Sequence, residues 1–204
     1  VPSVYDFQFD EYQDLTISIP HFTSLMEIFS HENIDIVQCS TPGPVGLAGL
    51  LAAKMMNLTV IGQYHTDFKA YTLKLTGDPI VANMVDGAVA TFYKAMDRVL
   101  VPSEWTGAMV KNMGIDPAKV QQVARGIDLN LFKPDQHSKD AYVRYGLNGE
   151  PKLLYVGRVS KEKNLHELVD TFQKVREEHE DARLVIVGDG PFTEELKEMF
   201  PADG

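Results

Sequence analysis

Apolar residues follow two spacings along this chain, one typical of buried strands and the other of amphipathic helices. Short apolar runs predict strands at residues 35–39, 58–62, 98–101, 120–123, 152–156 and 184–187. Between these runs, apolar positions at helical spacing predict a helix beginning near Phe22 and further helices at residues 45–57, 81–95, 104–113, 165–179 and 192–199. Strands that alternate with helices are typical of a parallel, doubly wound sheet. The pattern therefore predicts an α/β fold.

Two stretches depart from this alternation. Residues 1–20 alternate aromatic residues with acids, and we interpret them as an extended loop. Residues 125–134 break the rhythm, and a polar stretch at 135–140 follows, which is typical of a junction between domains. We therefore expect part of one α/β domain over residues 1–133 and the first part of a second over residues 134–204.

Composition and charge narrow the class of protein. The 204 residues are 44% hydrophobic and 24% charged, which is ordinary for a globular protein. The net charge of −10 disfavours a general nucleic-acid binder. No apolar run approaches the roughly 18–20 residues of a membrane span. The only cysteine, Cys39, excludes an internal disulfide and favours a reducing compartment, so we expect a cytoplasmic protein. Because the chain begins at Val1 without methionine, we expect a piece of a longer protein.

A basic segment follows the predicted strand at 152–156. Gly157 ends that strand, and Arg158, Lys161 and Lys163 come within the next six residues. Ligands of open α/β sheets bind beyond the carboxyl ends of the strands, and a helix amino terminus there favours anions. We therefore predict a diphosphate site. The plainer alternative is a solvated cationic loop, which composition alone would favour.

Five motifs occur in order along almost the whole chain. They are Tyr64-His-Thr-Asp-Phe68, Val101-Pro-Ser-Glu104, Arg125-Gly-Ile-Asp128, the segment Val156 to Leu165, and Val187-Gly-Asp-Gly-Pro191. Together they resemble the family 4 glycosyltransferases, also called group 1 glycosyl transferases, which have the GT-B fold. The resemblance implies two Rossmann-like domains. The acceptor binds mainly to the first domain and the nucleotide-sugar donor mainly to the second.

The resemblance also implies an activity. Members transfer a sugar with retention of configuration and without a metal ion or cofactor. We expect a hexosyltransferase that moves mannose or glucose from a UDP- or GDP-linked sugar to a lipid or glycan acceptor. Peripheral contact of the whole protein with the inner face of a membrane is a further hypothesis. The family's amino-terminal glycine-rich loop and its paired glutamates are missing, so we expect this piece to be inactive alone.

Site residues follow from the resemblance, position by position. Arg158 and Lys163 would hold the donor diphosphate, and His65 would face the donor sugar. The glycines at 157 and 188 would let the backbone approach the donor, because a residue without Cβ permits close contact. Thr66 and Asp67 would hold the acceptor.

Each of these residues also has a plainer interpretation. His65 can be an ordinary surface histidine, Asp67 a helix cap and Gly188 part of a strand-to-helix turn. We expect Lys161 to be exposed. The five other histidines show no metal-ligand spacing with one another or with Cys39.

Three other functions stay open from the sequence. The first is another GT-B enzyme, such as a sugar-nucleotide epimerase or a glycan phosphorylase, although no lysine for pyridoxal phosphate is visible. The second is a non-catalytic protein that binds sugar nucleotides. The third is an α/β interaction domain without a ligand.

Overall fold

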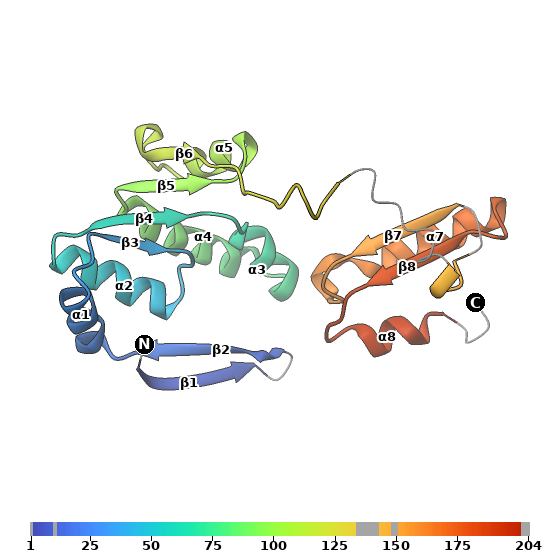
Figure 1. Cartoon of the computed structure of the whole chain (residues 1–204), viewed down its shortest axis with the longest axis horizontal. Helices are drawn as coiled ribbons and strands as arrows, with labels where there is room; N and C mark the ends of the chain where they lie inside the picture. Colours follow the sequence, from blue (N-terminus) through green and yellow to red (C-terminus); the bar gives the residue numbers. More distant parts are fainter. Residues whose placement is uncertain (1, 10–11, 134–142, 148–150, 201–204) are drawn as a thin grey trace. The chain divides into compact units, whose positions relative to one another are not determined.

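The computed structural model describes residues 2–9, 12–133, 143–147 and 151–200, and it divides into two compact units (Figure 1). Unit 1 is Val1–Gly126 and unit 2 is Ile127–Gly204. Each unit contains its own parallel sheet. The polar stretch at 135–140, which we interpret as the domain junction, lies outside the described residues.

Unit 1 is centred on a four-stranded parallel sheet in the order β3-β4-β5-β6. The strands are β3 (Ile36–Cys39), β4 (Thr59–Gln63), β5 (Arg98–Val101) and β6 (Val120–Gln122). The connections contain α2 (Pro44–Met55), α3 (Phe68–Thr76), α4 (Pro79–Lys94), α5 (Glu104–Asn112) and the 3-10 turn η1 (Pro117–Lys119), while α1 (Phe22–His31) precedes the sheet. The predicted parallel sheet is thereby confirmed for this unit.

Short polar residues set the ends of these helices. The Asp78 carboxylate accepts hydrogen bonds from the first amides of α4, and Ser103 does the same for α5. Gly114 ends α5 with a φ of +78°, a conformation that favours glycine. The helix that they bound was predicted from the sequence at residues 104–113, whereas α3 was not predicted.

The core of unit 1 lies between the sheet and its helices. Val60 of β4 and Val99 of β5 are fully buried, and both pack with Tyr93 of α4. The Tyr93 hydroxyl donates a hydrogen bond of 3.0 Å to the carbonyl oxygen of Gln63. This bond satisfies the buried hydroxyl and ties α4 to the carboxyl end of β4.

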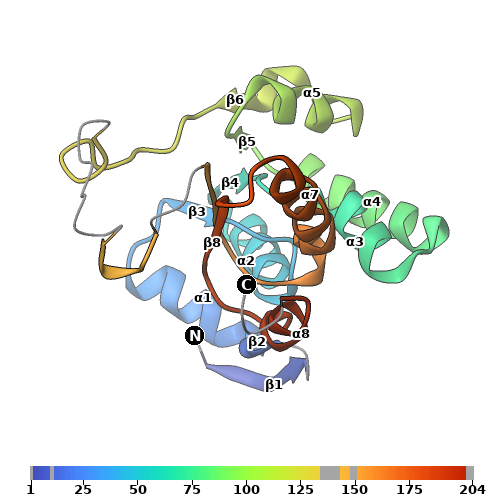
Figure 2. The same ribbon diagram turned by 90° about the vertical axis from the view of Figure 1, so that its right-hand side faces the viewer.

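Two paired strands lie within residues 1–20, and we call this pair the hairpin, so the predicted extended loop is wrong. Strand β1 (Ser3–Phe9) pairs antiparallel with β2 (Tyr12–Pro20). The alternation of aromatic and acidic residues has a period of two, which is the period of a strand, and aromatic side chains favour strands. Strand β2 packs on α2, which lies between the hairpin and the sheet in both views of the ribbon (Figures 1 and 2).

Unit 2 contains the parallel pair β7 (Lys152–Val156) and β8 (Arg183–Val187). The 3-10 turn η2 (Lys161–Lys163) and helix α7 (Leu165–Glu178) connect the two strands, and α8 (Thr193–Glu198) follows. The core of this unit joins Val159, Leu165, Val169, Phe192 and Leu196. In the described parts of both units, helices of sufficient length and apolarity to cross a membrane are absent.

Candidate diphosphate site and the segment after β4

A hollow of about 340 Å³ opens at the carboxyl end of β7. It is lined by Tyr155, Val156, Gly157, Arg158, Glu162 and Lys163. The structure therefore brings together three of the residues that the resemblance assigns to the donor, namely Gly157, Arg158 and Lys163. We call this hollow the basic pocket.

Gly188 lies directly against the backbone of the basic pocket. The ladder between β7 and β8 continues one residue past β7, because the amide of Gly157 donates to the carbonyl oxygen of Val187 over 3.0 Å. A Cβ atom on Gly188 would lie 1.8 Å from the carbonyl oxygen of Gly157, and Gly188 has a φ of +153°. Both facts restrict this position to glycine. Gly157 and Gly188 are thus adjacent at one edge of the sheet.

Tyr155 and Glu162 complete the basic pocket, and sequence reasoning missed both. The Tyr155 hydroxyl donates a hydrogen bond of 2.8 Å to the carbonyl oxygen of Arg158. The Glu162 side chain is only 10% exposed, and its carboxylate lies 4.0 Å from the Arg158 guanidinium. The spacing of four residues between Arg158 and Glu162 was the available signal. Glu162 restrains the guanidinium beside the pocket.

The position of Lys163 depends on the turn η2 and on Asn164. Asn164 adopts the left-handed conformation, with φ 57° and ψ 43°, between η2 and α7. The amides of Lys163 and Asn164 donate to the carbonyl oxygens of Ser160 and Lys161, each over 3.0 Å. Lys161 is exposed, as predicted, and is not among the described residues that line the pocket.

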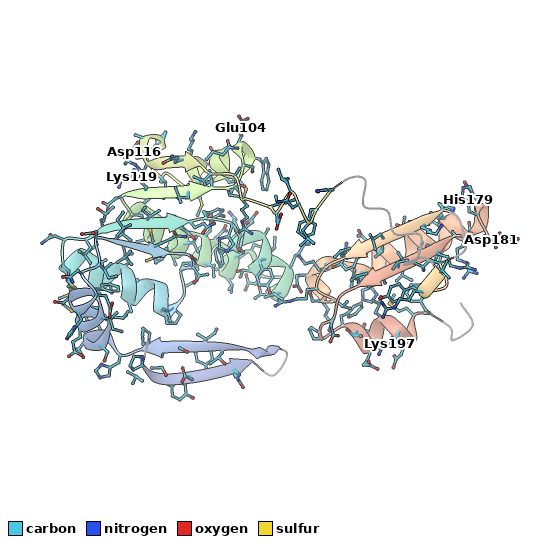
Figure 3. All side chains as sticks on the ribbon, viewed as in Figure 1. Glu104, Asp116, Lys119, His179, Asp181 and Lys197 are labelled. Atoms are coloured by element: carbon cyan, nitrogen blue, oxygen red, sulfur yellow. The ribbon has the colours of Figure 1, made fainter. Side chains whose placement is uncertain are left out.

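The charges around this pocket suit an anion. The Arg158 side chain is 52% exposed, so it can contact a ligand as well as Glu162. Figure 3 shows His179 and Asp181 at the opposite end of α7, roughly 20 Å along a helix of this length from its first residue. The acidic residues 177–181 are exposed, as expected of a solvated helix end. They are therefore too distant to neutralise the two cations of the pocket.

His65, Thr66 and Asp67 follow β4 in unit 1. His65 is exposed, while Tyr64 before it is only 2% exposed and packs edge-on against Tyr93 at 5.3 Å between ring centroids. Burial, together with the nearby charges of Asp67 and Asp86, raises the pKa of Tyr64 to about 12. Tyr64 is consequently a neutral anchor that holds His65 at the end of the strand.

The Asp67 carboxylate caps helix α3. Its Oδ1 atom accepts a hydrogen bond of 3.0 Å from the amide of Ala70. The amide of Phe68 donates to the carbonyl oxygen of Thr66 over 3.0 Å, which closes a tight turn. The interpretation of Asp67 as a helix cap is therefore confirmed. Its predicted contact with an acceptor stays a prediction.

Groups of three or more histidine, cysteine, aspartate or glutamate side chains able to hold a metal ion are not found in the described segments.

Family comparisons decide the identity of the fold. The family described as Glycosyltransferase Family 4 matches residues 1–131, and the one described as Glycosyl transferases group 1 matches residues 143–202. The chain belongs to the family 4 glycosyltransferases. The fold class is accordingly α/β of the GT-B type, as the resemblance predicted.

Curated relatives of this chain are named as sugar transferases or glycolipid synthases. The alpha-monoglucosyldiacylglycerol synthase of Streptococcus pneumoniae is 30% identical over 98% of this chain and 46% of its own length. The sulfoquinovosyl transferase SQD2 of Arabidopsis thaliana is 29% identical, over 93% of this chain and 37% of its own. A GDP-mannose-dependent alpha-mannosyltransferase of Mycobacterium tuberculosis is 28% identical, over 95% of this chain and 49% of its own length. The chain spans about half the length of the curated relatives that it matches.

Solved structures share the fold at low sequence identity. HepE of Anabaena, solved with UDP and glucose, has a TM-score of 0.66 at 15% identity. The match covers 87% of this chain and 46% of the HepE chain. A UDP-N-acetylglucosamine 2-epimerase of Rickettsia bellii has a TM-score of 0.51 at 15% identity. That match covers 96% of this chain and 51% of the epimerase chain. Both structures thus share the fold of this chain, and at 15% identity the likeness concerns the fold alone.

Proposed function

We propose that the whole protein transfers a hexose from a nucleotide-diphosphate sugar to a hydroxyl of a glycerolipid. The observation that carries this proposal is the basic pocket, in which Arg158 and Lys163 line one hollow at the carboxyl end of β7. A departing nucleoside diphosphate carries negative charge that must be neutralised as the glycosidic bond breaks. The two cations would supply that neutralisation, which is an electrostatic contribution to catalysis.

The division of labour between the two cations follows from their shapes. The planar guanidinium of Arg158 suits two oxygens of one phosphate, while the ammonium of Lys163 acts as a point charge. Glu162 holds the guanidinium at the pocket before the donor arrives. With both charges in place, we propose that the reaction needs neither a metal ion nor another cofactor.

The reaction proposed is substitution on one face of the sugar, with retention of configuration. The bond between the anomeric carbon and the diphosphate breaks, and the acceptor oxygen forms the new bond on the same face. The departing phosphate oxygen takes the proton of the acceptor hydroxyl. His65 would donate a hydrogen bond to the sugar, and Thr66 and Asp67 would hold the acceptor. This scheme needs no nucleophile from the protein.

The relatives favour a lipid acceptor over a glycan. The names of the Streptococcus pneumoniae synthase and of a phosphatidylinositol monomannoside mannosyltransferase of Mycobacterium tuberculosis both contain a glycerolipid. Glucose and mannose are the sugars in these names. A lipid acceptor would bring the whole protein to a membrane surface, which we place on the cytoplasmic side.

The test is a donor screen with the intact protein. UDP-glucose and GDP-mannose are each incubated with diacylglycerol, and nucleotide release and the glycolipid product are measured with and without EDTA. The proposal predicts release that depends on the acceptor and persists in EDTA. Release only with added magnesium would contradict the metal-independent reaction. Epimerised sugar without glycolipid would instead favour an epimerase, and binding without release a non-catalytic protein.

A further inference from the structure

A second and larger hollow lies entirely within unit 1. It has a volume of about 610 Å³, within the range of small-molecule sites. Strand β2, the turn after β3, the start of α3 and one face of α4 form its walls. It is lined by Thr16, Ile17, Ser18, Thr41, Pro42, Gly43, Pro44, Val45, Leu47, Phe68, Val85, Ala88, Val89 and Phe92. We call it the apolar pocket.

The turn after β3 is held firmly in place. A Cβ atom on Gly46 would lie 1.9 Å from the carbonyl oxygen of Thr41, so the turn packs directly on the first turn of α2. Pro42 and Pro44 restrict the backbone dihedrals on either side of Gly43. Val89 and Phe92 on the α4 side are nearly fully buried, so this wall of the pocket belongs to the packed core of unit 1.

The chemistry of the walls indicates an uncharged, aliphatic ligand. The described residues that line the pocket include no charged side chain. Val45 and Leu47 leave 45% and 48% of their surface exposed at its edge. The polar side chains are those of Thr16, Ser18 and Thr41. The Thr16 hydroxyl accepts a hydrogen bond of 3.0 Å from Gln8, and the Ser18 hydroxyl is hydrogen-bonded to Asp6. A nucleotide or a free sugar would lack the cations and the hydrogen-bonding groups that it needs, whereas an alkyl chain with an ester at one end matches both regions.

The pocket adjoins the segment assigned to the acceptor. Phe68 lines it and comes three residues after His65, and the turn between them is closed by the bond from the Phe68 amide to Thr66. Asp67 itself lines a different hollow, together with Tyr64 and Asp86, so the apolar pocket begins on the Phe68 side of this segment.

We infer that the apolar pocket binds one acyl chain of the glycerolipid acceptor. This inference rests on the proposed function, because it names the part of unit 1 that recognises the lipid. The hydroxyls of Thr16 and Thr41 donate to the ester end of the chain, and the methylenes lie against Val85, Val89 and Phe92. The glycerol hydroxyl is then left outside the pocket, on the side of His65.

The test measures binding of lipid separately from turnover. Dihexanoylglycerol and dioctanoylglycerol, each below its aggregation concentration, are titrated into the intact protein by calorimetry. One buried chain gains two methylenes between these lipids, which predicts binding tighter by roughly tenfold. Ala88 is an exposed residue of α4 that lines the pocket, and in the variant Ala88→Trp an indole fills the pocket. We expect the tighter binding of the longer lipid to disappear in this variant. The control Asn83→Trp places the same ring on the same helix outside the described lining, and the gain should persist.

The outcomes separate the inference from the proposed function. Loss of the chain-length gain in Ala88→Trp, with the gain retained in Asn83→Trp, supports the pocket even if no sugar is transferred. In that case the transfer proposal alone fails. Equal binding of both lipids by the unaltered protein, or an unchanged gain in Ala88→Trp, overturns the pocket even if diacylglycerol is glycosylated. Circular dichroism of both variants establishes that they are folded.

Discussion

The hydroxyl of Tyr155 donates a hydrogen bond of 2.8 Å to the carbonyl oxygen of Arg158. This bond joins the last part of β7 to the residue that we assign to the donor diphosphate. It fixes the backbone of Arg158, while the contact with Glu162 restrains the guanidinium. The basic pocket is thus built from local contacts within a segment of nine residues, from Tyr155 to Lys163.

Removing that hydroxyl should loosen the turn. In Tyr155→Phe we expect a loss of about 1 kcal/mol in the free energy of unfolding, because the carbonyl of Arg158 loses a hydrogen bond. The KM for the donor should rise more than kcat falls. Denaturant unfolding and steady-state kinetics of the intact protein measure both. Tyr145→Phe is the matched control, since Tyr145 is 66% exposed and should show neither change. Equal effects of the two variants would refute the role of Tyr155.

Gly188 should not tolerate even one added methyl group. In Gly188→Ala the new Cβ would meet the carbonyl of Gly157 at 1.8 Å, so the two turns must separate. We expect a loss of at least 2 kcal/mol in the free energy of unfolding, as for other severe steric clashes. Gly87→Ala is the contrast, because the new methyl group there has open space within a helix. That variant should be more stable by about 0.5–1 kcal/mol, and both are measured by thermal unfolding.

Asn164 carries the left-handed turn between η2 and α7. Asn164→Ala should lower the free energy of unfolding by about 1 kcal/mol, because the backbone of an alanine is strained in the left-handed conformation. Asn164→Gly should be close to neutral. The donor KM should follow the same order, since the turn positions Lys163. If alanine and glycine behave alike in both measurements, the backbone conformation is not what matters at this position.

Asp97 links three elements of unit 1 through its carboxylate. The hydrogen bonds from Lys54 and from the amide of Val60 hold the pKa of this carboxyl below its usual value of 3.8. A depressed folded-state pKa contributes stability above the ordinary value and loses it as the pH falls through the folded one. The contribution should therefore be complete above about pH 5 and disappear progressively below pH 4.

The variant Asp97→Asn tests that dependence. It should be less stable than the unaltered protein by about 1 kcal/mol at pH 7, a modest value because the pair is partly exposed. The difference between the two proteins should shrink as the pH falls from 5 to 3. Urea unfolding at each pH measures it, with Asp86→Asn as a control of a looser ion pair at 3.6 Å. A difference that is constant with pH would argue against the charge of Asp97.

Much of the fold was predictable because strand and helix periods differ clearly in this sequence. The strands at β3 to β8 and helices such as α4 and α7 follow from apolar spacing. The hairpin β1-β2 was missed because its polar content was given more weight than its period of two. Helix α3 was missed because it has no buried residue and therefore no apolar stripe.

The candidate site was predictable only in part. A glycine followed by cations after a strand indicated the basic pocket, and the family motifs named Arg158 and Lys163. The contribution of Tyr155 comes from a bond between a side chain and a backbone carbonyl, which leaves no pattern in the sequence. The apolar pocket was equally hidden, because its walls come from segments as distant as Ile17 and Phe92. Such sites depend on tertiary packing.

The central claim is that Arg158 and Lys163 neutralise the departing diphosphate. Its most direct test is kcat/KM of the intact enzyme for nucleotide release in Arg158→Ala and Lys163→Ala, with Lys161→Ala as control in the same turn. The account predicts losses of about 10²–10³-fold for the first two, as for removal of one preorganised charge-stabilising group. Lys161→Ala should remain within a few-fold of the unaltered enzyme. Near-normal release by Arg158→Ala, or equal losses in Lys161→Ala and Lys163→Ala, would contradict it.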